Sequence, residues 1–193
     1  GGADPRGGLR PRPPSARPRG GGGAPPPPPP PGPPTAGAAF ELAEVLPARP
    51  ALVWMSGLQR THQLAHALRR HRPDLPEPST DTRLNEMDFG GWEQQPWDNI
   101  PRSAFDHWMA DFAHHRFGGA ESTQAVIDRV AAALNDTRER LTQQSGTHAV
   151  WITHAGVIRA ARFLQTHGHR TVAGAHEWPQ DAPNPGGWTL LRW

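Results

Sequence analysis

The sequence predicts an α/β domain with a mostly parallel sheet, and two observations lead to this prediction. First, two short apolar runs, 51–55 (ALVWM) and 148–153 (HAVWIT), have the length and continuous hydrophobicity of buried strands. Second, each run is followed by apolar residues at helical spacing, over 58–70 and 157–166. Strands that alternate with helices are typical of a parallel sheet covered by helices.

The other elements follow from local patterns. A short first helix with an apolar stripe is predicted before Pro47 and consists of Phe40, Leu42, Val45 and Leu46. A helix is predicted over 97–112, and a longer one runs from Ser122, whose hydroxyl can cap it, to Gly146. Residues 188–193 predict a last strand.

The first part of the chain differs in composition from the rest. Residues 1–34 hold 14 of the 24 prolines and 9 of the 21 glycines, with one leucine and no aromatic residue. Such a segment cannot bury enough apolar surface to offset its conformational entropy. We therefore expect residues 1–38 to form a disordered tail rich in proline, glycine and arginine, and residues 39–193 to form the domain.

The charge distribution excludes several classes of partner. Five arginines against Asp4 give residues 1–34 a charge of +4, whereas 15 arginines against 17 acidic residues give the remainder −2. The basic character therefore predicts no nucleic-acid groove in the domain. The absence of cysteine excludes disulfides and thiolate metal sites, and no apolar run has the length of a membrane span. We expect a cytoplasmic protein without membrane association; the composition leaves the oligomeric state undetermined.

Two polar side chains follow the two predicted strands at the edge where functional groups gather in such sheets. Arg60 lies in the first turn of one helix, and His154 lies directly before another. An arginine and the amino terminus of a helix both favour an anion, so the pair suggests a phosphate site. His62 and His66 have the four-residue spacing of zinc ligands, but no third ligand is evident, and we expect no metal.

Four motifs occur in the order found in the histidine phosphatase superfamily, and the resemblance covers about residue 40 to the end. They are SGLQRTHQLA (56–65), LNEMDFGGWE (84–93), GGAES (118–122) and THAGVIRAA (153–161). The resemblance implies a three-layer αβα sandwich of the phosphoglycerate mutase type. The segments DTRLNEMDFGGWEQQPWDNIP and EWPQDAP are similar to bacterial α-ribazole phosphatases, which remove phosphate from a precursor of the cobalamin lower loop.

The resemblance also implies a role for each matching residue. Arg60 would clamp the phosphoryl oxygens, His154 would donate to one of them, and Glu86 would protonate the leaving oxygen. The backbone amides of Ala155 and Gly156 would contact the same oxygens at a helix start. The implied ligand is a small phosphorylated metabolite, and no cofactor is expected because arginine and histidine supply the charge stabilisation.

One part of the superfamily pattern is missing from the 193 residues. Members of the superfamily attack with a histidine in an Arg-His-Gly motif that ends the first strand, and no Arg-His-Gly occurs here. The expected place holds LRPRPPSARPRGGGG, so the first strand is predicted to be absent or replaced. Two explanations stay open: translation of another reading frame before about residue 40, or a pseudophosphatase that binds phosphate esters without turnover. Both predict little activity.

Two further residue groups have alternative interpretations. Ser56 can cap the helix that holds Arg60 or contact substrate, and capping is the favoured interpretation. Trp92, Trp97 and Trp108 can stack on an aromatic base of a substrate, although packing is the more frequent use of tryptophan.

Overall fold

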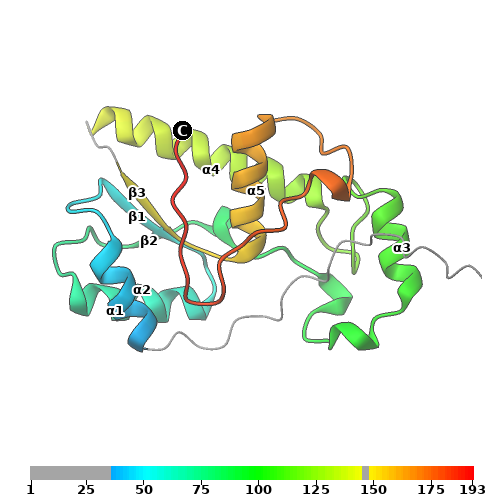
Figure 1. Ribbon diagram of the computed structural model, residues 1–193, viewed down its shortest axis with the longest axis horizontal. Coiled ribbons are helices and arrows are strands. Elements are labelled where there is room, and N and C mark those ends of the chain that lie inside the picture. The colour runs from blue at the N-terminus through cyan, green and yellow to red at the C-terminus, as the bar shows by residue number, and fades with distance from the viewer. Residues whose placement is uncertain (1–35, 145–147) are drawn as a thin grey trace, which may run out of the picture.

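A small parallel sheet lies between two pairs of helices in the computed structural model, which describes residues 36–144 and 148–193 (Figure 1). Within these residues the strands are β1 (Leu52–Met55), β2 (Ser79–Thr80) and β3 (Ala149–Ile152), in the order β2-β1-β3. Both pairings are parallel, and Met55 lies opposite Ile152. The carboxyl ends of β1 and β3 are therefore level, which brings the loops that follow them together.

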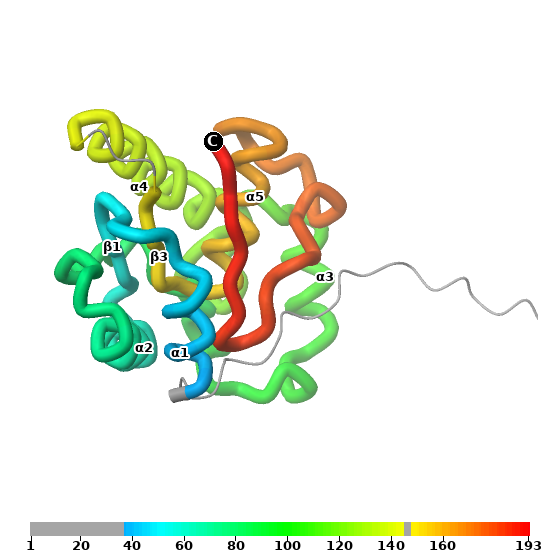
Figure 2. Tube along the Cα trace, turned by 60° about the vertical axis from the view of Figure 1, so that its left-hand side comes forward, coloured from blue at the N-terminus to red at the C-terminus, as the bar shows by residue number. Residues whose placement is uncertain are grey.

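Alternate side chains of β1 face the two helical layers, as the two-residue period of a strand requires. Leu52 and Trp54 belong to the apolar cluster with α4 and α5, whereas Val53 and Met55 belong to a second cluster with α1 and α2. The helices are α1 (Ala36–Val45), α2 (Gln59–His71), α4 (Thr123–Gln143) and α5 (Ala155–His167). Figure 2 shows α1 and α2 on one side of the sheet and α4 and α5 on the other. The three-layer αβα prediction is confirmed.

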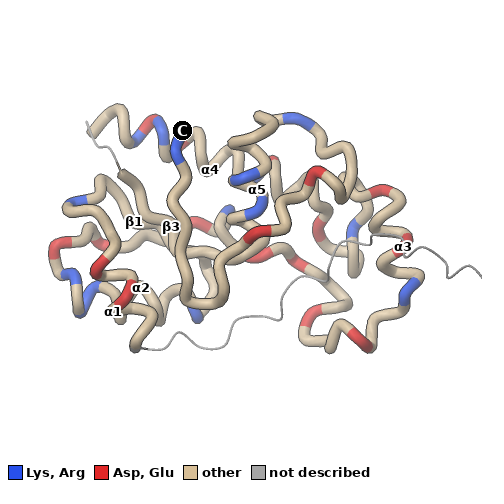
Figure 3. Tube along the Cα trace, in the orientation of Figure 1, with Lys and Arg blue, Asp and Glu red and all other residues tan. Residues whose placement is uncertain are grey.

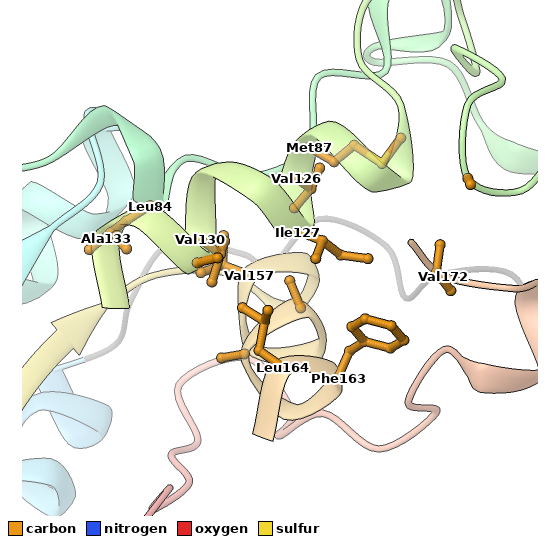
Figure 4. Packing of buried hydrophobic residues seen from close by; sticks show 14 of the residues in the cluster. Leu84, Met87, Val126, Ile127, Val130, Ala133, Val157, Phe163, Leu164 and Val172 are labelled. Atoms are coloured by element: carbon orange, nitrogen blue, oxygen red, sulfur yellow. The ribbon is translucent and has the colours of Figure 1, made fainter. Parts of the chain in front are cut away.

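The contact between α4 and α5 holds the larger part of the core. Ile127 and Val130 of α4 are fully buried and face Val157 and Phe163 of α5 (Figure 4). The apolar residues at 126, 127, 130 and 134 recur at helical spacing and all point inward. Ser122 begins α4, and its hydroxyl accepts a hydrogen bond from the backbone N–H of Ala125 at 3.2 Å, which confirms the predicted cap.

The segment between β2 and α4 is mostly irregular and lies beside the carboxyl ends of the strands. Its helical elements are η1 (Thr82–Leu84), η2 (Gly90–Trp92), η3 (Trp97–Asn99) and α3 (Arg102–Ala110), and a further turn, η4 (Ala175–Glu177), follows α5. Gly118 has φ +81°, and a Cβ there would overlap the carbonyl oxygen of Phe89. Only glycine permits this close approach of two backbone segments, which holds the aromatic side chains of the segment together.

The helix predicted over 97–112 is wrong in its extent. The structure divides it into η3 and α3 at Pro101 and ends α3 at Ala110. A proline disfavours helical backbone in the residue before it, and Ile100 is extended with ψ 127°. Pro101 instead lies directly before the first residue of α3, where its missing N–H costs no helical hydrogen bond.

The first helix is present, but its buried face differs from the predicted stripe. Ala39 and Ala43 are buried, whereas Phe40 and Val45 are 54% and 45% exposed. Small side chains at the helix contact allow α1 to approach α2 closely, and the ring of Phe40 packs edge-on against His71 at the surface. Leu42 and Leu46 of the predicted stripe do pack against the core, whereas Phe40 and Val45 do not.

The strand predicted over 188–193 is wrong. Residues 188–193 form no strand pairing, and α5 instead provides their hydrogen bonds. Arg162 donates to the hydroxyl of Thr189 at 3.0 Å, and Gln165 donates to the backbone oxygen of Arg192. A strand needs a neighbouring strand to pair with, whereas the polar groups of this segment accept hydrogen bonds from side chains of α5.

Acidic and basic residues are mixed over the described elements (Figure 3). Across these elements, none of the helices combines the length and apolar character that crossing a membrane requires.

The predicted boundary between tail and domain at 38/39 falls inside α1, and residues 1–35 of the predicted tail lie outside the described residues.

Candidate functional site

The loops after β1 and β3 bring Arg60 and His154 into direct contact. Arg60 is the second residue of α2, and His154 is the residue before α5. The Nε and Nη2 atoms of Arg60 lie 3.1 and 2.9 Å from Nδ1 of His154. The two side chains that sequence reasoning selected, 94 residues apart, therefore converge at one edge of the sheet.

The protonation state of His154 follows from these contacts. A guanidinium only donates, so Nδ1 accepts and the ring proton is on Nε2. Nε2 lies 2.8 Å from Oγ of Ser56, which completes the pairing of both ring nitrogens. Burial, followed by the charges of Arg60 and Arg129, lowers the pKa of His154 from 6.5 to about 3. His154 is thus a neutral imidazole at neutral pH.

The low pKa of His154 predicts that acid destabilises the fold. Below pH 6.5 the unfolded chain binds a proton that the folded chain excludes until about pH 3. Folding stability should therefore fall as the pH drops through this range, with a slope from this residue approaching about 1.4 kcal/mol per pH unit. Chemical denaturation of the wild type and of His154→Gln, between about pH 7 and about pH 4.5, measures the difference in slope.

A matched control for this experiment is His66→Gln, because His66 is exposed on α2. Its stability should follow the wild-type pH profile. If His154→Gln also shows the wild-type slope, then burial does not suppress protonation of His154.

Ser56 lies behind His154 and not at the start of α2. Leu58 precedes α2 as its N-cap and makes no side-chain cap, so the favoured capping role of Ser56 is wrong. Ser56 has 0% exposure, which also leaves no surface for a substrate. Its hydroxyl lies 2.8 Å from that of Thr61 and 3.2 Å from the backbone nitrogen of Leu58. Ser56 therefore belongs to a buried hydroxyl network that supports the imidazole.

Glu86 lies against the amino terminus of α5. Its Oε1 accepts hydrogen bonds from the backbone N–H groups of Gly156 at 3.1 Å and Met87 at 3.0 Å. Burial raises the pKa of Glu86 above its ordinary value, and these two N–H groups and the charge of Arg60 only partly oppose the rise. A Cβ at position 156 would overlap Oε1 of Glu86, so this contact requires glycine.

A cavity of about 810 Å³ joins these groups. Its lining includes Arg60, Glu86, His154, Ala155 and Gly156, all five of the residues selected from the sequence. Five aromatic side chains line it as well, namely Phe89, Trp92, Trp97, Trp108 and Trp178. The cavity therefore combines groups that favour an anion with aromatic surface that an apolar group can contact.

The three tryptophans weighed from the sequence both pack and line the cavity. Trp97 and Trp108 stack on the ring of Phe117 at 6.0 and 4.5 Å, and Trp92 contacts the same ring at 6.2 Å. Phe117 itself is fully buried. The packing interpretation is therefore confirmed, and the cavity position keeps a substrate contact open.

Sequence reasoning missed Arg159, which also lines the cavity. It is partly buried, and this burial lowers its pKa. Its guanidinium makes a long hydrogen bond, 3.4 Å from Nη2 to the carbonyl oxygen of Gln180. Its position three residues after Gly156 places it one helical turn further along the same face of α5, and this spacing was the available signal.

Among the described residues, no group of three acidic or histidine side chains could hold a metal ion.

An arginine and a histidine at adjacent strand ends, with a helix amino terminus beside them, form an arrangement that favours an anion. A protein-family profile matches residues 36–191 and identifies the group. The chain belongs to the histidine phosphatase superfamily (branch 1).

Solved structures with the same fold include several phosphatases. A mycobacterial glucosyl-3-phosphoglycerate phosphatase in complex with inorganic phosphate is 25% identical, with a TM-score of 0.57 over 69% of each chain. The α-ribazole phosphatase of Shigella flexneri is 27% identical, with a TM-score of 0.55 over 67% of this chain and 64% of that one. A comparison with curated proteins gives no significant match.

Two mycobacterial hydrolases share the fold as well. They are 24% and 26% identical, with TM-scores of 0.54 and 0.51. The alignments cover 69% and 67% of this chain but only 64% and 57% of those two chains. The chain described here therefore matches less than two thirds of the length of these relatives.

Proposed function

We propose that the chain binds a phosphomonoester through Arg60, His154 and the amino terminus of α5. The observation that carries this proposal is the direct contact between the guanidinium of Arg60 and the imidazole of His154 at the amino terminus of α5. The guanidinium offers a planar set of donors that suits phosphoryl oxygens. The membership of the superfamily and its phosphatase relatives support the same class of ligand.

Each residue has a role in this proposal. Arg60 leaves Nδ1 of His154 and donates to two phosphoryl oxygens. The neutral imidazole of His154 then takes up at Nδ1 the proton of the monoanionic phosphate and donates a hydrogen bond back to one of these oxygens. The backbone N–H groups of Ala155 and Gly156 lie at the positive end of the α5 dipole and favour the same anion. Glu86, whose pKa burial raises, holds a proton for the leaving oxygen.

The substrate we propose is α-ribazole 5'-phosphate, which would place the protein in cobalamin biosynthesis. Its aromatic base would contact the aromatic wall of the cavity, where Trp92 and Trp97 lie next to Glu93 and Gln94. The Shigella flexneri structure of this activity shares the fold. What supports this substrate is that aromatic side chains line the same cavity as Arg60 and His154.

We further propose that the 193 residues bind this ester with little or no turnover. No Arg-His-Gly occurs among them. We do not assign the role of the missing nucleophile to His154, because Ser56 pairs with its Nε2, its Nδ1 donates to the phosphoryl oxygen in this proposal, and its low pKa makes it a poor base. The chain is then either an impaired phosphatase or a phosphate-ester-binding pseudophosphatase.

Titration calorimetry with α-ribazole 5'-phosphate and an assay with p-nitrophenyl phosphate test the proposal together. We expect saturable binding and no p-nitrophenol above the rate of a His154→Gln preparation. Steady turnover with an acid-labile phosphoenzyme would refute the loss of activity, and the absence of any binding would refute the site. A chain in which a strand ending in Arg-His-Gly replaces the residues before 36 should release p-nitrophenol.

A further inference from the structure

Ser56 is joined to His154 by both its backbone and its side chain. Its backbone N–H donates to the carbonyl oxygen of Ile152 at 3.1 Å, two residues before His154. Its Oγ lies 2.8 Å from Nε2 of His154. The parallel register of β1 and β3 therefore determines where this hydroxyl meets the imidazole.

The direction of every proton in this network follows from the donors. His154 and the backbone N–H of Leu58 both donate to Oγ of Ser56, so the hydroxyl proton of Ser56 points to Oγ1 of Thr61. Thr61 in turn donates to the carbonyl oxygens of Leu58 at 2.7 Å and of Ser56 at 3.0 Å. Each hydroxyl has a donor and an acceptor, so the network favours a single arrangement in the buried site.

We propose that Ser56 is a positioning residue that holds His154 in the Nε2–H tautomer with Nδ1 facing the anion. This inference rests on the proposed function for its ligand, a phosphoryl group. Because Ser56 retains Nε2–H when Arg60 turns to the ligand, Nδ1 faces the phosphoryl group, takes up the proton of the monoanionic phosphate and donates a hydrogen bond to a phosphoryl oxygen. Without the hydroxyl, the Nε2 proton would have no acceptor in a buried place, and the ring would rotate or change tautomer.

The tautomer of His154 is measured directly by nitrogen-15 NMR of the imidazole ring. In the wild type without ligand we expect a single Nε2–H form, assigned by its loss in His154→Gln. An Nδ1–H form in the wild type overturns the proposal without any substitution at Ser56.

The substitution Ser56→Ala should produce a mixture of tautomers and weaken binding of inorganic phosphate by roughly 3- to 10-fold. The matched control is Ser103→Ala on α3, because Ser103 is exposed, and it should change neither quantity. A folded Ser56→Ala protein with a pure Nε2–H form and unchanged phosphate affinity overturns the role. If the tautomer changes but even the wild type binds no phosphate, the positioning role stands and the proposed function fails.

Discussion

Replacing Arg60 by alanine should weaken the binding of inorganic phosphate by roughly 100-fold, as measured by titration calorimetry. The guanidinium lies 2.9 Å from His154, so the change removes the principal positive charge at the proposed anion position. Arg60→Lys should recover only part of the loss, because an ammonium retains the charge but not the paired donors. The same change should raise the pKa of His154, since the charge of Arg60 contributes to lowering it.

The matched control is Arg102→Ala, whose side chain is 86% exposed on α3. It removes the same charge from the protein and should leave phosphate affinity within about 2-fold, because exposed charges are screened. A similar loss in both variants would attribute the effect to net charge and not to the site. Unchanged affinity in Arg60→Ala would contradict the proposed role.

Truncation of Phe117 to alanine should cause the largest loss of stability, about 3 to 5 kcal/mol, measured by chemical denaturation. The ring is fully buried and contacts Trp108 at 4.5 Å and Phe105 at 5.1 Å. Its removal would leave a cavity among closely packed rings, and such a packed interior relaxes only partly. The aromatic wall of the binding cavity includes Trp97 and Trp108, so ligand affinity should fall as well.

Phe40→Ala is the comparison for this prediction. It removes the same ring at a position that is 54% exposed, and it should cost less than about 1 kcal/mol. Equal losses for the two variants would show that the Phe117 cluster is not the centre of the core next to the site.

The elements that were predicted well depend on residues close together in the chain. Five consecutive apolar residues indicated β1, and the cap at Ser122 with its apolar spacing indicated α4. The positions of Arg60 and His154 followed from the same local rule, because a residue after a parallel strand lies at the edge where the next helix begins. The sequence alone therefore selected the two side chains that the structure brings into contact.

The failures came from contacts between distant segments. Residues 188–193 have the composition of a strand, but strand formation depends on an available edge, and α5 binds them instead. In α1 the choice between Phe40 and Ala39 for the buried face depends on how closely α2 approaches. Neither condition can be read from a window of neighbouring residues.

The sequence by itself indicated the αβα class, the strands β1 and β3 with the helices that follow them, and the five candidate residues that line the cavity. Only the tertiary structure decided the hydrogen-bond partners and the protonation states of those groups. Ser56 and His154 are 98 residues apart, and Glu86 and Gly156 are 70 apart. Their contacts set the tautomer of the histidine and the pKa of the carboxyl, because both depend on burial and on partners that only folding brings within hydrogen-bond distance.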